Sequence, residues 1–183
     1  MSDAGMDTTQ YLLDALRKGS DLEAASDGVI HYRAPADATR STLPDGDVDV
    51  VFSNSVLEHV PPDVIDAMYA ESMRILSPRG VMFHSVNCGD HYAYVDRNVH
   101  QLNYLRYSDE EWQRWNNAFL YQNRLRAHWF VDGARRHGFD IDLDTRTTRA
   151  DSDRSALLRA WRAAASSAAS TRCVASGWRC ASR

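Results

Sequence analysis

Two apolar runs, separated by one amphipathic segment, dominate the hydrophobic pattern of the chain. The first run lies within residues 48–52 and the second within 81–86, and both are rich in β-branched and aromatic residues. Apolar residues in direct succession are typical of strands buried on both faces of a parallel sheet. Residues 62–76 place their apolar side chains on one helical face, after a Pro-Pro pair that suits a helix start. The pattern predicts a strand-helix-strand unit over residues 47–86, with parallel strands and a right-handed crossover.

Small polar residues follow the first predicted strand directly. Ser53, Asn54 and Ser55 stand where the apolar run ends and the chain turns toward the helix. Open α/β sheets bind their ligands in the crevice outside the carboxyl ends of the strands. Asn54 and Ser55 could also cap the following helix, and both roles can hold together. We therefore expect a ligand crevice at this turn.

Shorter patterns predict the remaining elements. Ser108 and Glu111 form a capping box that opens a helix, and its Trp112 and Trp115 are expected in the core. The other expected elements are one or two short helices within 8–25, a strand at 29–33, a helix through 125–137 that stops at Gly138, and a half-exposed strand at 139–143.

Composition is that of a globular protein with one domain. The 183 residues are 44% hydrophobic and 10% aromatic, which is enough for one sizeable core. No apolar run has the length of a signal peptide or a membrane span, so we expect a cytoplasmic protein without a membrane partner. The three cysteines form no CxxC pair and the seven histidines no HExxH motif. Neither a disulfide framework nor a metal site is therefore expected.

Charge divides the chain into an acidic body and a basic tail. Residues 146–183 hold eight of the 21 Lys and Arg but only two of the 25 Asp and Glu, a net charge of +6 against −10 for the rest. An acidic body makes nucleic acid an unlikely partner, because phosphate binding needs a basic face. The tail is rich in Ala and Ser and has no strand-like run, so we expect it to be disordered or non-native.

The order of these motifs resembles a class I S-adenosylmethionine-dependent methyltransferase of the methyltransferase type 11 kind. The resemblance covers about residues 29–145 and rests on the run DVVFSNSVLEHV at 49–60 and the turn RILSPRG before the second strand. It implies an α/β fold, a Rossmann-like doubly wound sheet of parallel strands that ends in an antiparallel strand. We find no sequence for that last strand in the tail.

Two parts of the family's cofactor site are missing from the sequence: the glycine-rich turn after the first strand, and the acid after the second strand that binds the ribose hydroxyls. No GxG turn occurs anywhere, and only about 28 residues precede the first predicted strand, too few for the family's first strands. We therefore expect an incomplete sheet, truncated at its N-terminal half, in a protein that is a fragment. Its expected parts are a helical lead-in at 1–28, a partial methyltransferase domain at 29–145 and the tail at 146–183.

The resemblance also implies site residues. The acid after the third family strand contacts adenine, and Asp37 with the adjacent Ala38 stands at that position. The turn after the next strand lines the cofactor cleft, and His59 is a candidate general base, a role that geometry must support. The turn residues are Ser53, Asn54, Ser55, Val56 and Leu57.

A long loop after the second strand is the expected substrate-contacting region. Residues 87–108 are rich in His and Tyr, and long loops inside compact domains are often functional lids. The same aromatics could simply pack the loop against itself. The expected substrate contacts are His91, Tyr92, Tyr94 and Tyr104.

The sequence thus predicts an enzyme that transfers a methyl group from S-adenosylmethionine to an unidentified acceptor, with an unknown oligomeric state. Without the glycine turn, we expect this chain to bind the cofactor weakly or not at all. One alternative is a non-catalytic α/β remnant that acts as an interaction module through an unpaired strand edge. A further alternative is association with nucleic acid through the Arg-rich tail.

Overall fold

The computed structural model describes residues 14, 17, 21–145 and 172–176, the last of these as backbone only. The chain divides into two compact units, residues 1–37 and 38–183. In the first unit, helix α2 (Leu22–Ala25) begins at Asp21, whose carboxylate accepts a hydrogen bond from the Ala24 amide at 2.7 Å. The strand predicted at 29–33 is wrong, because these residues form irregular backbone. A strand needs a neighbour for its backbone groups, and the described part of this unit contains none.

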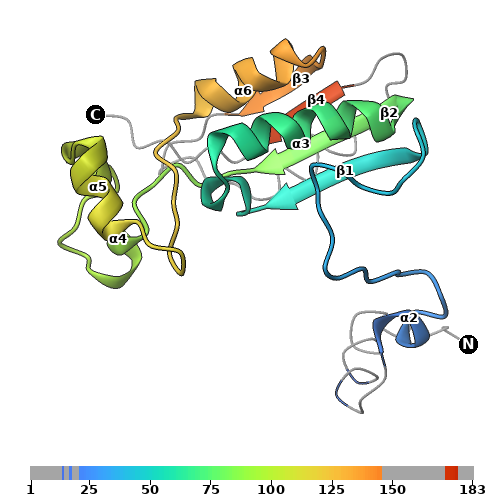
Figure 1. Ribbon diagram of the computed structural model, residues 1–183, viewed down its shortest axis with the longest axis horizontal. Coiled ribbons are helices and arrows are strands. Elements are labelled where there is room, and N and C mark those ends of the chain that lie inside the picture. Colours follow the sequence, from blue (N-terminus) through green and yellow to red (C-terminus); the bar gives the residue numbers. More distant parts are fainter. Residues whose placement is uncertain (1–13, 15–16, 18–20, 146–171, 177–183) are drawn as a thin grey trace, which may run out of the picture. The chain divides into compact units, whose positions relative to one another are not determined.

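The second unit is built on a four-stranded parallel sheet with the order β1-β2-β4-β3 (Figure 1). The strands are β1 (Val48–Asn54), β2 (Leu76–Ser85), β3 (Asp140–Thr145) and β4 (Arg172–Ser176). The predicted strand-helix-strand unit is confirmed, since β1 and β2 pair in parallel and helix α3 (Pro62–Ile75) connects them. Val48 pairs with Leu76, whereas Val50 pairs with Val81. The predicted SPRG turn is therefore an irregularity within β2.

The two apolar runs are buried to different degrees. Val81, Met82 and His84 of β2 are all buried, as expected for a strand between neighbours. On β1, Val50 is 42% exposed and Phe52 is 74% exposed. The prediction of burial on both faces is thus correct for β2 and wrong for β1. The physical reason is that the core packs on one face of β1: Val48 and Val51 contact it, whereas Val50 and Phe52 do not.

The tail contributes a strand that the sequence pattern does not reveal. β4 lies between β2 and β3 and pairs with both of them in parallel. The prediction that the tail contains no strand is therefore wrong, and β4 is parallel to its neighbours, unlike the last strand of the family. An inner strand has its backbone groups paired on both sides, so five residues suffice without a strong hydrophobic pattern. The rest of the predicted disordered tail lies outside the described residues.

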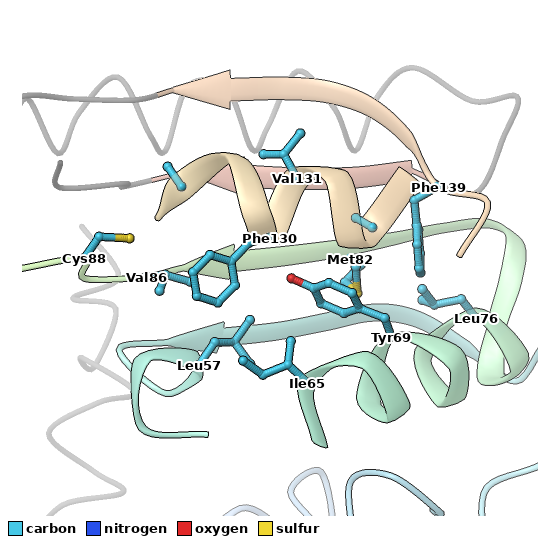
Figure 2. Close-up of a cluster of buried hydrophobic side chains, with 12 residues drawn as sticks. Leu57, Ile65, Tyr69, Leu76, Met82, Val86, Cys88, Phe130, Val131 and Phe139 are labelled. Carbon is cyan, nitrogen blue, oxygen red and sulfur yellow. The ribbon is translucent and has the colours of Figure 1, made fainter. Parts of the chain in front are cut away.

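The core fills the space between the sheet and two helices, α3 and α6 (Ala127–Arg136). Figure 2 shows Tyr69 from α3 and Phe130 from α6 approaching each other above Met82 of β2. These three side chains are at most 2% exposed. Burial of each such side chain stabilises the fold by about 1.5–3 kcal/mol. No helix among the described residues is long and apolar enough to cross a bilayer.

Three short helices follow β2 and precede α6 in the sequence. They are the short helices α4 (Tyr92–Val95) and η2 (Asn103–Arg106) and helix α5 (Asp109–Trp115). The predicted capping box is confirmed, with Ser108 as the N-cap of α5. Trp112 is 6% exposed, as expected for the core, but Trp115 is 52% exposed and the same prediction is wrong for it. Trp115 is the last residue of α5, and its ring packs on that of Tyr107 with centroids 6.2 Å apart.

The end of α6 follows the predicted pattern. The helix stops at His137, and Gly138 has a φ of 89°, a left-handed conformation that suits glycine. Strand β3 then alternates between half-buried and exposed positions, as predicted. The prediction of this helix-strand pair is confirmed.

Candidate functional site

The carboxyl ends of β1 and β2 lie side by side and form the floor of the candidate site. Asn54 pairs with Ser85, and the Ser55 amide donates a hydrogen bond to the Ser85 carbonyl at 2.8 Å. Ser55 has a φ of 55°, in the left-handed region, where the chain leaves the sheet. The 3-10 helix η1 (Leu57–His59) follows at once. This turn therefore lies where open α/β sheets hold ligands.

Ser53 points to a histidine of the neighbouring strand. Its hydroxyl lies 2.7 Å from Nδ1 of His84, which is buried and stacks on Tyr69 with ring centroids 5.9 Å apart. Burial lowers the pKa of His84 to about 4, so the ring is neutral at physiological pH. Ser53 thus ties the two strand ends together, and its predicted contact with a cofactor stays a prediction.

The other turn residues divide into exposed and buried groups. Asn54, Ser55 and Val56 are exposed, and Val56 is 42% exposed. Leu57 is fully buried in the core, and its predicted contact with the cofactor stays a prediction. The expected capping role of Asn54 and Ser55 is also wrong. Helix α3 has Pro61 as its N-cap, and no side chain caps it.

The predicted adenine contact stays a prediction. Asp37 is the last residue of the first compact unit, whereas Ala38 begins the second unit. Both residues are exposed and lie in irregular backbone. Asp37 and the turn after β1 therefore belong to different units.

The predicted substrate loop is partly a packed element. Tyr104 is fully buried, and its hydroxyl donates to the Cys88 carbonyl at 2.7 Å and accepts from Arg126 at 2.8 Å. Its side chain thus connects the loop to the start of α6, and its predicted contact with substrate stays a prediction. Tyr92 and Tyr94 are exposed on α4 and stay candidates.

Two histidines from distant segments meet beside this loop. The rings of His59 and His91 lie 4.8 Å apart in an edge-on arrangement. Nδ1 of His59 lies 2.8 Å from the Tyr121 carbonyl, which can only accept a hydrogen bond. The neutral His59 ring therefore carries its proton on Nδ1 and its lone pair on Nε2. Burial and the neighbouring His59 lower the pKa of His91, whereas Asp90 opposes this effect.

Glu58 is the site residue that the sequence analysis missed. Its carboxylate is 2% exposed, and burial raises its pKa. The nearby amides of Glu58 and Asn87, the His59 ring and the Ser55 hydroxyl oppose this rise. Ligand atoms of Glu58, His59 and His91 all lie within 4.8 Å of one another, so these residues could hold a metal ion. In the sequence, the only sign of such a site was that Glu58 and His59 follow each other shortly after a predicted strand.

A buried polar segment fixes this arrangement from the other side. The Asn123 amide group donates to the carbonyls of Leu57 at 2.7 Å and Val60 at 2.8 Å, and its backbone amide donates to the Glu58 carbonyl at 2.8 Å. Gln122 accepts a hydrogen bond from the His91 amide at 3.2 Å. The sequence pattern gave no sign of these contacts, since Gln and Asn in an irregular segment usually face solvent.

An open cleft of about 860 Å³ lies next to this segment. Trp112, Asn116, Tyr121 and Arg124 are among its lining residues. The carbonyl of Tyr121 holds His59, so the cleft adjoins the histidine pair. Its size is sufficient for a small organic molecule.

Comparison with known proteins concerns the first half of the chain. Residues 4–84 match the family model of the methyltransferase domain, a match that includes β1, α3 and nearly all of β2. The loop at 87–108 lies outside it. No curated protein and no solved structure matches the chain significantly. Over residues 4–84, the chain is therefore similar to the methyltransferase domain.

Proposed function

We propose that the chain takes part in S-adenosylmethionine-dependent methyl transfer, with Asn54, Ser55 and Val56 forming one wall of the cofactor site. The observation that carries this proposal is the turn after β1. It lies at the carboxyl end of a parallel strand pair, within the segment that matches the methyltransferase family. Its three residues are exposed.

The exposed turn suits part of the cofactor. Asn54 and Ser55 offer amide and hydroxyl groups for the polar amino-acid and ribose portions, and Val56 offers an apolar surface for the adenosine. When bound, the cofactor supplies a methyl group already activated by its sulfonium centre. The chain's part is to hold and orient donor and acceptor, which requires no covalent enzyme nucleophile.

The acceptor side is proposed to include α4. Tyr92 and Tyr94 are exposed there, and the Tyr94 ring lies 5.4 Å from that of His91. The chemical class of the acceptor is not identified by these residues. A general-base role for His59 would use Nε2, because Nδ1 is engaged with the Tyr121 carbonyl.

Equilibrium dialysis of the full chain against radiolabelled S-adenosylmethionine tests the proposal. We expect saturable but weak binding, since only one wall of the pocket is identified here. Val56→Ser should weaken binding by about threefold to tenfold, because it removes apolar contact worth about 1 kcal/mol. Val50→Ser is the matched control, since Val50 on the outward face of β1 is also 42% exposed.

Two results would contradict the proposal. One is the absence of binding at millimolar cofactor, which would favour the non-catalytic interaction module. The other is an equal loss of binding in both variants, which would show that the turn has no special role.

A further inference from the structure

Glu58 is a buried carboxylate whose nearest donors, the amides of Glu58 and Asn87 and the Ser55 hydroxyl, do not reach it in hydrogen-bonding geometry. It is 2% exposed, and neither of its side-chain oxygens has a hydrogen-bond partner among the described residues. Burial of a polar group without compensation costs several kcal/mol, roughly 2–7 for a neutral group and more for a charged one. Native proteins therefore pair such groups with a donor, a water molecule or a metal ion.

A second buried and unpartnered polar atom lies beside it. Nε2 of His91 is buried and has no partner in the described part of the chain. Its ring is in edge contact with that of His59, whose Nδ1 faces the Tyr121 carbonyl. Two imidazoles and one carboxylate thus converge, with ligand atoms within 4.8 Å of one another.

The surroundings hold these three residues as in a prepared metal site. The Tyr121 carbonyl fixes the His59 tautomer so that Nε2 carries the lone pair. The backbone around Glu58 is held by Asn123, and that of His91 by Gln122. All three anchors come from residues 121–123, so one segment orients the whole group. The contact of the His59 ring with a backbone carbonyl is typical of histidines that bind metal ions.

We propose that Glu58, His59 and His91 form a binding site for a divalent transition-metal ion of the Zn²⁺ type. Two imidazole nitrogens with one carboxylate oxygen suit such ions, whereas Mg²⁺ and Ca²⁺ prefer oxygen donors. Metal-ligand bonds of about 2.0–2.2 Å place tetrahedral donors roughly 3.4 Å apart, so the side chains close by little more than 1 Å on binding. Three protein ligands would leave one position of a tetrahedral ion open for water.

The site does not depend on methyl transfer. None of its residues is proposed to contact the cofactor, and its test needs no cofactor. When Nε2 of His59 binds the metal ion, it is not free to act as a general base, so the two roles of His59 exclude each other. The alternative is that Glu58 is protonated and binds no metal ion. Titration of the chain with a metal ion distinguishes the two cases.

The experiment is calorimetric titration of the tag-free, chelator-treated full chain with Zn²⁺, paired with the visible absorption spectrum of Co²⁺. We expect one equivalent to bind with micromolar affinity or better and to raise the melting temperature. Glu58→Gln, which preserves size, and His91→Gln should each weaken binding by at least about tenfold. The control is His128→Gln, since His128 is exposed on α6.

Circular dichroism checks that each variant is folded. Glu58→Gln and His91→Gln each remove a different ligand, so each tests the site separately. Loss of the Co²⁺ spectrum in both, with retention in His128→Gln, would support the site. The proposal is overturned if the wild-type chain shows no stoichiometric binding. It is overturned equally if His128→Gln lowers the affinity as much as the ligand variants do, since binding would then be adventitious.

Discussion

A single hydrogen-bonded pair, Ser53 and His84, links the ends of the two strands that define the site. His84 is fully enclosed by the fold, and its ring is neutral because burial lowers its pKa to about 4. The sequence shows this histidine only as one polar residue within an apolar run. Its partner could not be predicted, because the pairing depends on the register of β1 against β2.

Stability should depend on pH through His84. In the unfolded chain His84 is protonated near pH 6.5, whereas in the folded chain it is protonated only near pH 4. Its contribution to the free energy of unfolding is therefore greatest above about pH 6.5. It should fall by up to about 3 kcal/mol as pH is lowered from 6.5 to 4. Urea unfolding at several pH values measures this slope.

The matched variant for this prediction is His84→Gln, which retains a polar side chain but does not titrate. Other titrating groups, including Glu58 and His91, are common to both proteins and cancel in the comparison. The wild-type chain should lose more stability than the variant between pH 7 and pH 5. Parallel slopes would show that His84 is not the buried neutral group described here.

At the scale of elements, the strand contributed by the tail is the main departure from the sequence pattern. β4 lies between β2 and β3, and its backbone is paired on both sides. The local sequence RCVAS is too short and too mixed to identify a strand. Tertiary pairing decides its conformation, which is why the tail could be interpreted as lacking structure.

A proline in β4 should therefore be costly. Ala175→Pro removes an amide hydrogen from an inner strand opposite His84, with an expected loss of about 3 kcal/mol or more in the free energy of unfolding. Ala118→Pro is the control, since Ala118 is exposed in a turn, and it should cost less than about 1 kcal/mol. Urea denaturation compares the two variants, and an equal effect would mean that residues 172–176 add no strand.

At the scale of the whole molecule, the sequence predicted the positions of helices and strands better than it predicted their burial and their pairing. The β1-α3-β2 unit was readable because each element has its own strong period and turn residues mark its ends. The predictions of a strand at 29–33 and of burial of β1 on both faces were wrong, since both depend on the elements that surround these residues. Within the site, Asn54, Ser55 and Val56 were placed correctly at the strand end. Glu58 was missed, because a three-residue helix shows no period from which its inward side could be read.

The central claim is that the turn after β1 binds the cofactor, and amide chemical shifts of the isotopically labelled full chain test it most directly. Titration with S-adenosylmethionine to millimolar concentration detects even weak binding and shows where it occurs. The account predicts saturable shifts at Asn54, Ser55 and Val56 that S-adenosylhomocysteine reproduces and free methionine does not. Unchanged amides at these three residues, or larger shifts confined to α5 and the adjoining cleft, would contradict it.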